Sequence, residues 1–378
     1  MPPSTSNAER DYDALLKQKL ASGLPLADAK EVVARQKARD KKLADTAAAA
    51  APAAPVIKGG KPAADEPASS PAVTAPQMID AFEGTFGAHA GQRRNHTKGL
   101  CAAGEFVGTS DAAALSRSAL FSGKSTPVIA RFSIGGGDPD VPDAAPAPRG
   151  MALEFHLPGG ALQHITMINV PIFGATSPSS FRDAIVAAKP DPKTGQPDPE
   201  KLKAYAASHP DAMALTELSS HHRPTANYYQ TTYFSIHTFK FIDAKGAEHP
   251  VKWRFVPRDG TKELTAAEMK TAPHDFLEQN LIARARKGPV LWDMIVYVGE
   301  PGDPQDNPTL AWPETRKHFT AGTLTITEAT PQQKGLACEP INFDPLVMAD
   351  GMAPTNDPIL LFRSPAYAVS FGKRLSGQ

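Results

Sequence analysis

The chain has few cysteines, no excess charge of either sign and no long apolar segment. Of its 378 residues only Cys101 and Cys338 are cysteines, which excludes a disulfide-rich scaffold and a zinc site built from cysteines alone. Its 40 basic and 40 acidic side chains cancel, so no net field attracts nucleic acid or an anionic membrane. No apolar stretch approaches the roughly 20 residues of a membrane-spanning helix. We therefore expect neither a nucleic-acid nor a membrane partner.

The first residues also lack the basic and apolar segments of a secretory signal peptide. We therefore expect a cytoplasmic protein, and a periplasmic location is the less favoured alternative. In a reducing compartment Cys101 and Cys338 are expected to be free thiols. A single disulfide between them is the alternative that the sequence leaves open.

Proline is abundant, and changes in composition divide the chain into three regions. The 37 prolines are about twice the usual share of roughly 5%. Residues 1–44 combine short apolar repeats with many charges and predict a helical arm, either a solvated helix pair or a docking arm. Residues 45–77 hold few large apolar side chains, so burial cannot offset the entropy of ordering and we predict a disordered linker. Residues 78–378 form the globular body.

The globular body contains several segments of strand character with helical patterns between them. The strand candidates, rich in β-branched and aromatic residues, are Thr126–Ser133, Met151–Leu157, Ile165–Ile168, Tyr233–Ile242, Val251–Val256, Leu291–Val298 and Gly322–Thr327. The helix candidates are Phe181–Ala188, Pro199–Ala207 and Ala266–Lys287. This pattern predicts an α+β fold, in which an antiparallel β-barrel with helical insertions can enclose a ligand.

Four short motifs hold the residues most able to carry chemistry. His96 lies in the basic segment 93–99, where a histidine taken alone is more often a surface or packing residue. Arg131 ends an apolar strand, and an enclosed guanidinium needs an anion or several acceptors. Asn169 lies in an apolar run, either as a functional amide or as a turn residue before Pro171.

The fourth motif pairs Arg363 with Tyr367. Residues four apart share one face of a helix, so the guanidinium can approach the phenol oxygen if this segment is helical. Pro365 is compatible with that helix if it lies in the first turn. A free tyrosine has a pKa of about 10, and ionising it at neutral pH takes roughly 4 kcal/mol, which an arginine and a ferric ion together can supply. A surface Arg–Tyr pair is the alternative.

In this order the motifs resemble those of the haem catalases, and most closely the short catalase-related peroxidases. They read Arg-x-x-His-x-Lys-Gly, Arg-Phe-Ser, Asn-x-Pro-x-Phe and Arg-x-x-x-Tyr. Further matches are Pro148-Arg149-Gly150, Phe155 and His237-Thr238-Phe239. The resemblance extends over about residues 78–378, and it implies a catalase-like barrel with haem b as the cofactor.

The resemblance implies a role for each residue near the iron. Tyr367 corresponds to the tyrosinate that ligates haem iron, and Arg363 to the residue that keeps it ionised. His96 corresponds to the distal base and Asn169 to the distal amide. Ser133 corresponds to the hydroxyl that supports the histidine.

The same resemblance implies which residues hold the cofactor. Arg93, Arg131 and Arg374 correspond to the arginines that bind the haem propionates. His237 is similar in position to a histidine at the haem edge, and Phe181 to an aromatic residue beside the porphyrin.

The reaction that the resemblance implies is a peroxidase reaction on hydrogen peroxide, with organic peroxides as further candidates, through a ferryl-porphyrin intermediate. Small organic donors then reduce that intermediate, and some catalase activity accompanies the reaction. Only 11 residues follow Tyr367, which we expect to leave an open route that favours the peroxidase reaction. The alternatives are a haem-dependent lipid hydroperoxide isomerase or lyase and a non-catalytic haem carrier. We expect a homo-oligomer, either a dimer or a tetramer.

Overall fold

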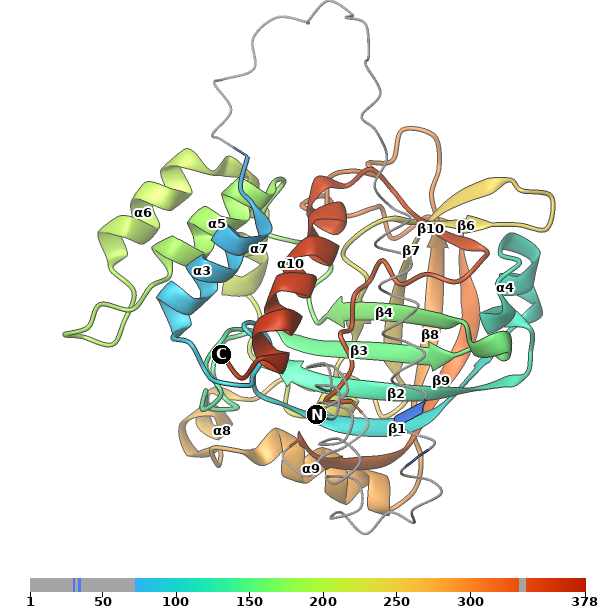
Figure 1. Ribbon diagram of the computed structural model, residues 1–378, viewed down its shortest axis with the longest axis horizontal. Coiled ribbons are helices and arrows are strands. Elements are labelled where there is room, and N and C mark those ends of the chain that lie inside the picture. Colours follow the sequence, from blue (N-terminus) through green and yellow to red (C-terminus); the bar gives the residue numbers. More distant parts are fainter. Residues whose placement is uncertain (1–29, 31–32, 35–71, 333–337) are drawn as a thin grey trace, which may run out of the picture. The chain divides into compact units, whose positions relative to one another are not determined.

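The computed structural model describes residues 30, 33–34, 72–332 and 338–378 (Figure 1). The chain divides into two compact units, residues 1–67 and residues 68–378, and all elements named below belong to the second. Most of the predicted arm and most of the predicted linker lie outside the described residues, so both stay predictions. The first helix of the second unit, α3 (Ala75–Phe86), begins three residues before the predicted boundary, where Thr74 and Gln77 form a capping box.

A closed antiparallel barrel of eight strands lies at the centre of the described part of the chain. The barrel strands are β1 (Gly99–Gly108), β2 (Ser125–Ile134), β3 (Arg149–His156), β4 (Leu162–Ile168), β5 (Tyr233–Phe234), β7 (Glu248–Pro257), β8 (Val290–Val298) and β9 (His318–Pro331). The barrel closes because β7 pairs with both β5 and β8. Strands β6 (Phe239–Ile242) and β10 (Met352–Pro354) extend the sheet beyond β7. The predicted barrel is confirmed.

Alternation along the strands separates an aromatic interior from a polar outer face. Phe106, Phe155 and Trp292 are fully buried inside, and the rings of Phe106 and Phe155 meet edge to face with centroids 5.5 Å apart. On β2 the side chain of Phe132 joins this core. Since successive side chains of a strand point to opposite faces, Arg131 points outward, away from the barrel interior.

Three helices lie together against the outer face of the barrel. Helix α10 (Pro358–Leu375) packs on α3 and α5 (Pro178–Ala187), and Figure 1 shows it crossing in front of β2 to β4. Met78, Phe82 and Ile185 form a second apolar core between these helices. The remaining helices are α4 (Ser110–Leu115), α6 (Pro199–Ser208), α7 (Met213–Ser220), α8 (Ala266–Thr271) and α9 (Phe276–Arg286).

Several predicted elements differ from the observed ones. Tyr233–Ile242 is two strands rather than one, because the intervening Ile236 has a φ of 54°, which cannot continue a strand. The helix predicted over Ala266–Lys287 ends at Thr271 and restarts at Phe276, since Pro273 disfavours helical backbone in the residue before it. Strand β1 was not predicted.

Pro365 lies inside α10, seven residues after the helix begins at Pro358, so it is not in the first turn, and the helix nevertheless continues through it. Proline has no N–H for the carbonyl four residues earlier. That carbonyl belongs to Leu361, a residue that is 42% exposed, so water can provide the missing hydrogen bond. Among the described residues no helix combines the length and the apolar character needed to cross a membrane.

Cys101 and Cys338 form a disulfide with their Cα atoms 5.5 Å apart. The expectation of free thiols is therefore wrong, and the alternative of one pairing is the state found. The pairing of β1 with β9 explains it, because the register places Thr330 beside Cys101 and brings the chain after β9 back to this strand. Disulfides persist mainly in oxidising compartments, so this bond does not support the predicted cytoplasmic location, which stays a prediction.

Candidate functional site

A cavity of about 370 Å³ lies between the outer face of the barrel and helices α3, α5 and α10. Its walls are mostly apolar, with side chains such as Met78, Ile79 and Phe86. Of the residues predicted from the sequence, all except Asn169 are among its lining residues; these are Arg93, His96, Arg131, Ser133, Phe181, His237, Arg363, Tyr367 and Arg374. The fold thus brings together motifs that are up to 281 residues apart in the sequence.

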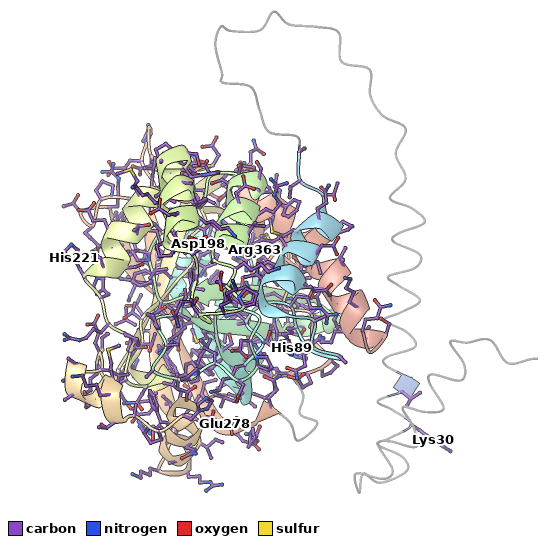
Figure 2. All side chains as sticks on the ribbon, turned by 90° about the vertical axis from the view of Figure 1, so that its left-hand side faces the viewer. Lys30, His89, Asp198, His221, Glu278 and Arg363 are labelled. Atoms are coloured by element: carbon purple, nitrogen blue, oxygen red, sulfur yellow. A yellow bond between two sulfur atoms is a disulfide. The ribbon has the colours of Figure 1, made fainter. Side chains whose placement is uncertain are left out.

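Helix α10 presents Arg363 and Tyr367 to this cavity. Asp357 caps the start of the helix, and its carboxylate accepts hydrogen bonds from the N–H groups of Ile359 and Leu360. Arg363 Nη2 donates to Tyr367 Oη at 2.7 Å and to Thr166 Oγ1 of β4 at 2.7 Å. Figure 2 shows Arg363 within the body of the domain. The phenol oxygen therefore lies against a guanidinium group that a second hydrogen bond holds in place.

His96 faces the same cavity from the segment before β1. Its φ is 53°, a left-handed conformation that costs roughly 1–3 kcal/mol and must be held by neighbours. Asn95 Oδ1 accepts the His96 N–H at 2.9 Å, and Arg131 Nη1 donates to the His96 carbonyl at 2.8 Å. The ring Nδ1 lies 3.0 Å from Ser133 Oγ. Backbone and ring are thus both fixed.

The electrostatics of the cavity keep the His96 imidazole neutral. Burial, together with the positive charges of Arg131 and Arg363, lowers the pKa of His96 to about 3. A neutral imidazole has one ring nitrogen that donates and one that accepts. With Nδ1 engaged by Ser133, Nε2 can serve as the proton acceptor at neutral pH.

Gly150 of β3 leaves the space in which this histidine sits. A Cβ atom at position 150 would lie 2.7 Å from Ser133 Oγ and 2.8 Å from His96 Nδ1. Both distances are shorter than any real carbon contact of this kind, so the close approach of ring and strand requires glycine.

His237 and Asp357 form a buried pair at the start of α10. His237 is 0% and Asp357 1% exposed, and Nδ1 of the ring lies 2.6 Å from Asp357 Oδ2. The other ring nitrogen, Nε2, is buried and has no hydrogen-bond partner among the described residues. Burial lowers the pKa of His237 to about 4, although the Asp357 carboxylate opposes this change.

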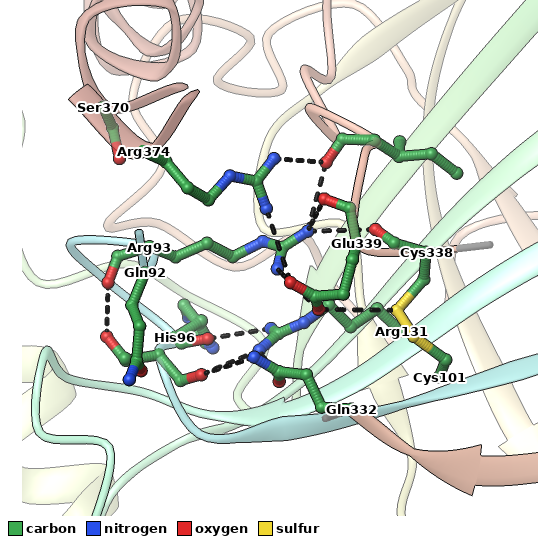
Figure 3. Close-up of polar contacts among 12 residues, drawn as sticks. Gln92, Arg93, His96, Cys101, Arg131, Gln332, Cys338, Glu339, Ser370 and Arg374 are labelled. Carbon is green, nitrogen blue, oxygen red and sulfur yellow. Dashed lines mark hydrogen bonds and ion pairs between the residues drawn. A yellow bond between two sulfur atoms is a disulfide. The ribbon is translucent and has the colours of Figure 1, made fainter. Parts of the chain in front are cut away.

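Arg93, Arg131 and Arg374 all line the cavity, and Figure 3 shows them as a cluster. Arg131 Nη2 donates to the Thr97 carbonyl and to Gln332 Oε1, and Arg93 Nη1 donates to both Glu339 oxygens at 3.0 and 3.2 Å. Burial and mutual repulsion lower the pKa of Arg374 to about 9 and lower that of Arg131 as well. Within the described residues, Arg131 Nε and Arg374 Nη1 are buried without a hydrogen-bond partner.

Two predicted residues occupy peripheral positions. Phe181 of α5 packs against Phe173 with ring centroids 4.8 Å apart, as part of the cavity wall. Asn169 adjoins the lining residue Ile168 but is not itself in the wall. Its Oδ1 accepts the N–H of Arg149 at 2.8 Å, which leaves its NH₂ group as the end available to a ligand.

Sequence reasoning missed Thr166, Asp357 and Glu339. A signal existed for Asp357, because Asp followed by Pro358 is a common helix start. Thr166 lies in a predicted strand. Its role depends on the hydrogen bond that it accepts from Arg363, which is distant in the sequence. Glu339 carries no local signal.

A family model described as Catalase matches residues 77–378. The chain belongs to the catalase family. This membership classes it with oxidoreductases that act on peroxide, and it implies a haem cofactor.

Individual relatives agree with this membership. The chain is 51% identical over 305 residues to a catalase-related peroxidase of Synechococcus elongatus, covering 81% of this chain and 90% of the relative. It is 35% identical to a catalase-related peroxidase of Mycolicibacterium paratuberculosis, covering 79% and 94%. The predicted resemblance to the short branch of this family is confirmed.

Solved catalases share the fold. Catalase A from Saccharomyces cerevisiae superposes with a TM-score of 0.71 at 26% identity, covering 76% of this chain and 62% of its own length. A fungal catalase gives 0.70 at 23% identity, covering 76% and 60%. The chain thus spans about 60% of the length of these solved catalases.

The residues of the cavity fit a haem group in the catalase family. Arg131 Nε and Arg374 Nη1 are buried donors without a partner among the described residues, as expected of a site that receives carboxylates. Apolar walls suit a porphyrin, and the phenol of Tyr367 is an oxygen ligand that haem iron accepts.

We predict that Gly150→Ala displaces the His96 ring, since the added methyl group would overlap both the ring and Ser133. Peroxide-dependent turnover should fall at least about tenfold, as expected when a catalytic group is moved by as little as 1 Å. Steady-state kinetics measure this loss. Gly84→Ala is the matched control, because nothing lies within 4 Å of the added atom. Unchanged turnover in Gly150→Ala would show that the ring is not confined there.

A second prediction concerns acid stability. A histidine with its ordinary pKa of 6.5 takes up a proton in the unfolded chain, whereas folded His237 resists protonation down to about pH 4. Between these values the unfolded state binds more protons, so stability falls as pH falls, by up to about 1.4 kcal/mol per pH unit. His237→Gln should make this slope shallower.

Urea denaturation between pH 4 and 7 measures the slope. His221→Gln is the control, because that histidine is exposed and stands at the surface in Figure 2. Equal slopes for wild type and His237→Gln would mean that His237 does not resist protonation in the folded protein.

Proposed function

We propose that the protein is a haem b peroxidase that reduces hydrogen peroxide with small organic electron donors and has some catalase activity. Organic peroxides are further candidate substrates. The family also favours a homo-oligomer. One observation carries the proposal: a single cavity receives the Arg363–Tyr367 pair, joined at 2.7 Å, and the His96–Ser133 pair, joined at 3.0 Å.

Tyr367 would hold the iron, and Arg363 would support Tyr367. Tyr367 Oη is the proposed ligand, and Arg363 Nη2 donates a hydrogen bond to that oxygen. Thr166 accepts a second bond from the same nitrogen, which fixes the orientation of the guanidinium. When bound, haem supplies the redox-active iron at which peroxide is reduced.

His96 would move the proton. Its Nε2 would take a proton from one oxygen of the peroxide and return it to the other, which would leave as water, with the electrons for breaking the oxygen–oxygen bond supplied by haem. The lowered pKa of His96, about 3, keeps the ring neutral and able to accept that proton over the physiological range. The NH₂ group of Asn169 would orient the substrate, while the apolar wall around Phe181 excludes bulk water.

The first test of this proposal is the absorption spectrum. Wild-type protein loaded with haem should give a high-spin ferric spectrum, and Tyr367→Phe should change its Soret band because the oxygen ligand is lost. Tyr297→Phe is a control on β8, where the hydroxyl contacts Glu314 outside the cavity. An unchanged spectrum in Tyr367→Phe would remove tyrosine as the ligand.

The second test separates peroxidase from carrier and isomerase. We predict that His96→Ala retains haem but loses about 10²- to 10⁴-fold in peroxide-dependent donor oxidation, the usual worth of a general acid–base group. Stopped-flow measurement follows donor oxidation and oxygen evolution in parallel. Haem binding without peroxide-dependent turnover in the wild type would favour a carrier, and consumption of linoleate hydroperoxide without a donor would favour an isomerase or lyase. Full turnover in His96→Ala would show that His96 is not the proton-transfer group.

A further inference from the structure

Both terminal nitrogens of Arg93 donate hydrogen bonds to one short segment of the chain, residues 338–341. Its Nη1 donates to both carboxylate oxygens of Glu339 at 3.0 and 3.2 Å. Its Nη2 donates to the carbonyls of Cys338 at 3.0 Å and Ile341 at 3.1 Å. The arginine assigned to a haem propionate by resemblance is therefore already engaged by residues 338–341 (Figure 3).

The disulfide fixes this segment beside the arginine cluster. Cys338 is bonded to Cys101 of β1, and Glu339 is the next residue. On the far side, the Ile341 carbonyl accepts from Arg374 Nη2 at 3.2 Å, and Glu339 Oε2 lies 3.9 Å from Arg374 Nη1. The carboxylate thus lies between Arg93 and Arg374, and the covalent bond one residue away limits how far it can move.

We propose that Glu339 competes with the carboxylates of haem for Arg93, and that the Cys101–Cys338 disulfide holds it in that position. This inference rests on the proposed function, since it requires haem to bind in the cavity.

The charges of the cluster support competition. Three guanidinium groups face a single carboxylate here among the described residues, so Glu339 cancels part of the positive charge that the two propionates of haem would otherwise meet. The bidentate contact between Arg93 Nη1 and Glu339 is a strong charge-assisted pair, so a propionate can take those donors only after Glu339 leaves. The Glu339 side chain is 29% exposed, so it can move into solvent when a propionate displaces it.

Reduction of the disulfide would weaken this competitor. A dithiol reductant breaks the sulfur–sulfur bond by transferring two electrons and two protons to Cys101 and Cys338, and is itself oxidised to a disulfide. The segment then keeps its hydrogen bonds to Arg93 but loses its covalent tether to β1. Haem affinity would consequently be higher in the reduced protein than in the oxidised protein.

Haemin titration of the full-length chain tests this competition, with the dissociation constant read from the Soret absorbance rather than from activity. Glu339→Gln should bind haemin about tenfold more tightly than wild type, since it loses the charged contact with Arg93. Glu328→Gln is the matched control, because Glu328 is an exposed carboxylate of β9. It should leave the affinity unchanged.

The role of the disulfide is tested with Cys101→Ser/Cys338→Ser, which stands for the reduced state without a thiol that could ligate haemin. This variant should also bind more tightly than wild type, and adding Glu339→Gln to it should give little further gain, because both changes remove the same competitor. If the serine variant does not fold, Glu339→Gln with the disulfide intact still decides the competition.

Weaker or equal binding in Glu339→Gln would overturn the proposal and make Glu339 a residue that orients Arg93. A serine variant that folds but binds as wild type would overturn the role of the disulfide. Failure of wild-type protein to bind haemin at all would instead refute the proposed function, so the two failures are distinguishable.

Discussion

The buried contact between His237 and Asp357 fixes the start of helix α10 on the barrel, and the arrangement of the cavity depends on it. Asp357 also accepts the first N–H groups of the helix, so one carboxylate both starts the helix and ties it to the segment before β6. A charge with so little exposure is tolerated only when all its acceptors are used. From this fixed start the helix carries Arg363, Tyr367 and Arg374 to the cavity.

The opposite wall of the cavity owes its geometry to strand alternation. Arg131 and Ser133 of β2 share the outer face, so one secures the His96 carbonyl and the other meets its ring. Gly150 on the neighbouring strand supplies the missing volume. The strained backbone of His96 is held by Asn95 and Arg131, and its ring by Ser133, which is how a sparsely populated conformation persists.

Much of the barrel could be predicted from the sequence, and the reasons for the failures are physical. Strands such as Thr126–Ser133 carry β-branched and aromatic residues, whereas β1 contains the weak segment Cys101–Gly104 and gave no such signal. The motif order pointed to the family and to the residues of the cavity. The disulfide and the contact of Glu339 with Arg93 join segments more than 230 residues apart, and only the β1–β9 pairing brings them together.

The backbone of α10 fixes the spacing of the residues that this helix brings to the cavity. A helix rises about 1.5 Å per residue, so positions 363, 367 and 374 fall roughly 6 and 10 Å apart along one stripe of its surface. The phenol and guanidinium groups at these positions move together when the helix moves as a rigid body. The spacing along the helix between Tyr367, the proposed iron ligand, and Arg374 is therefore set by the backbone of α10.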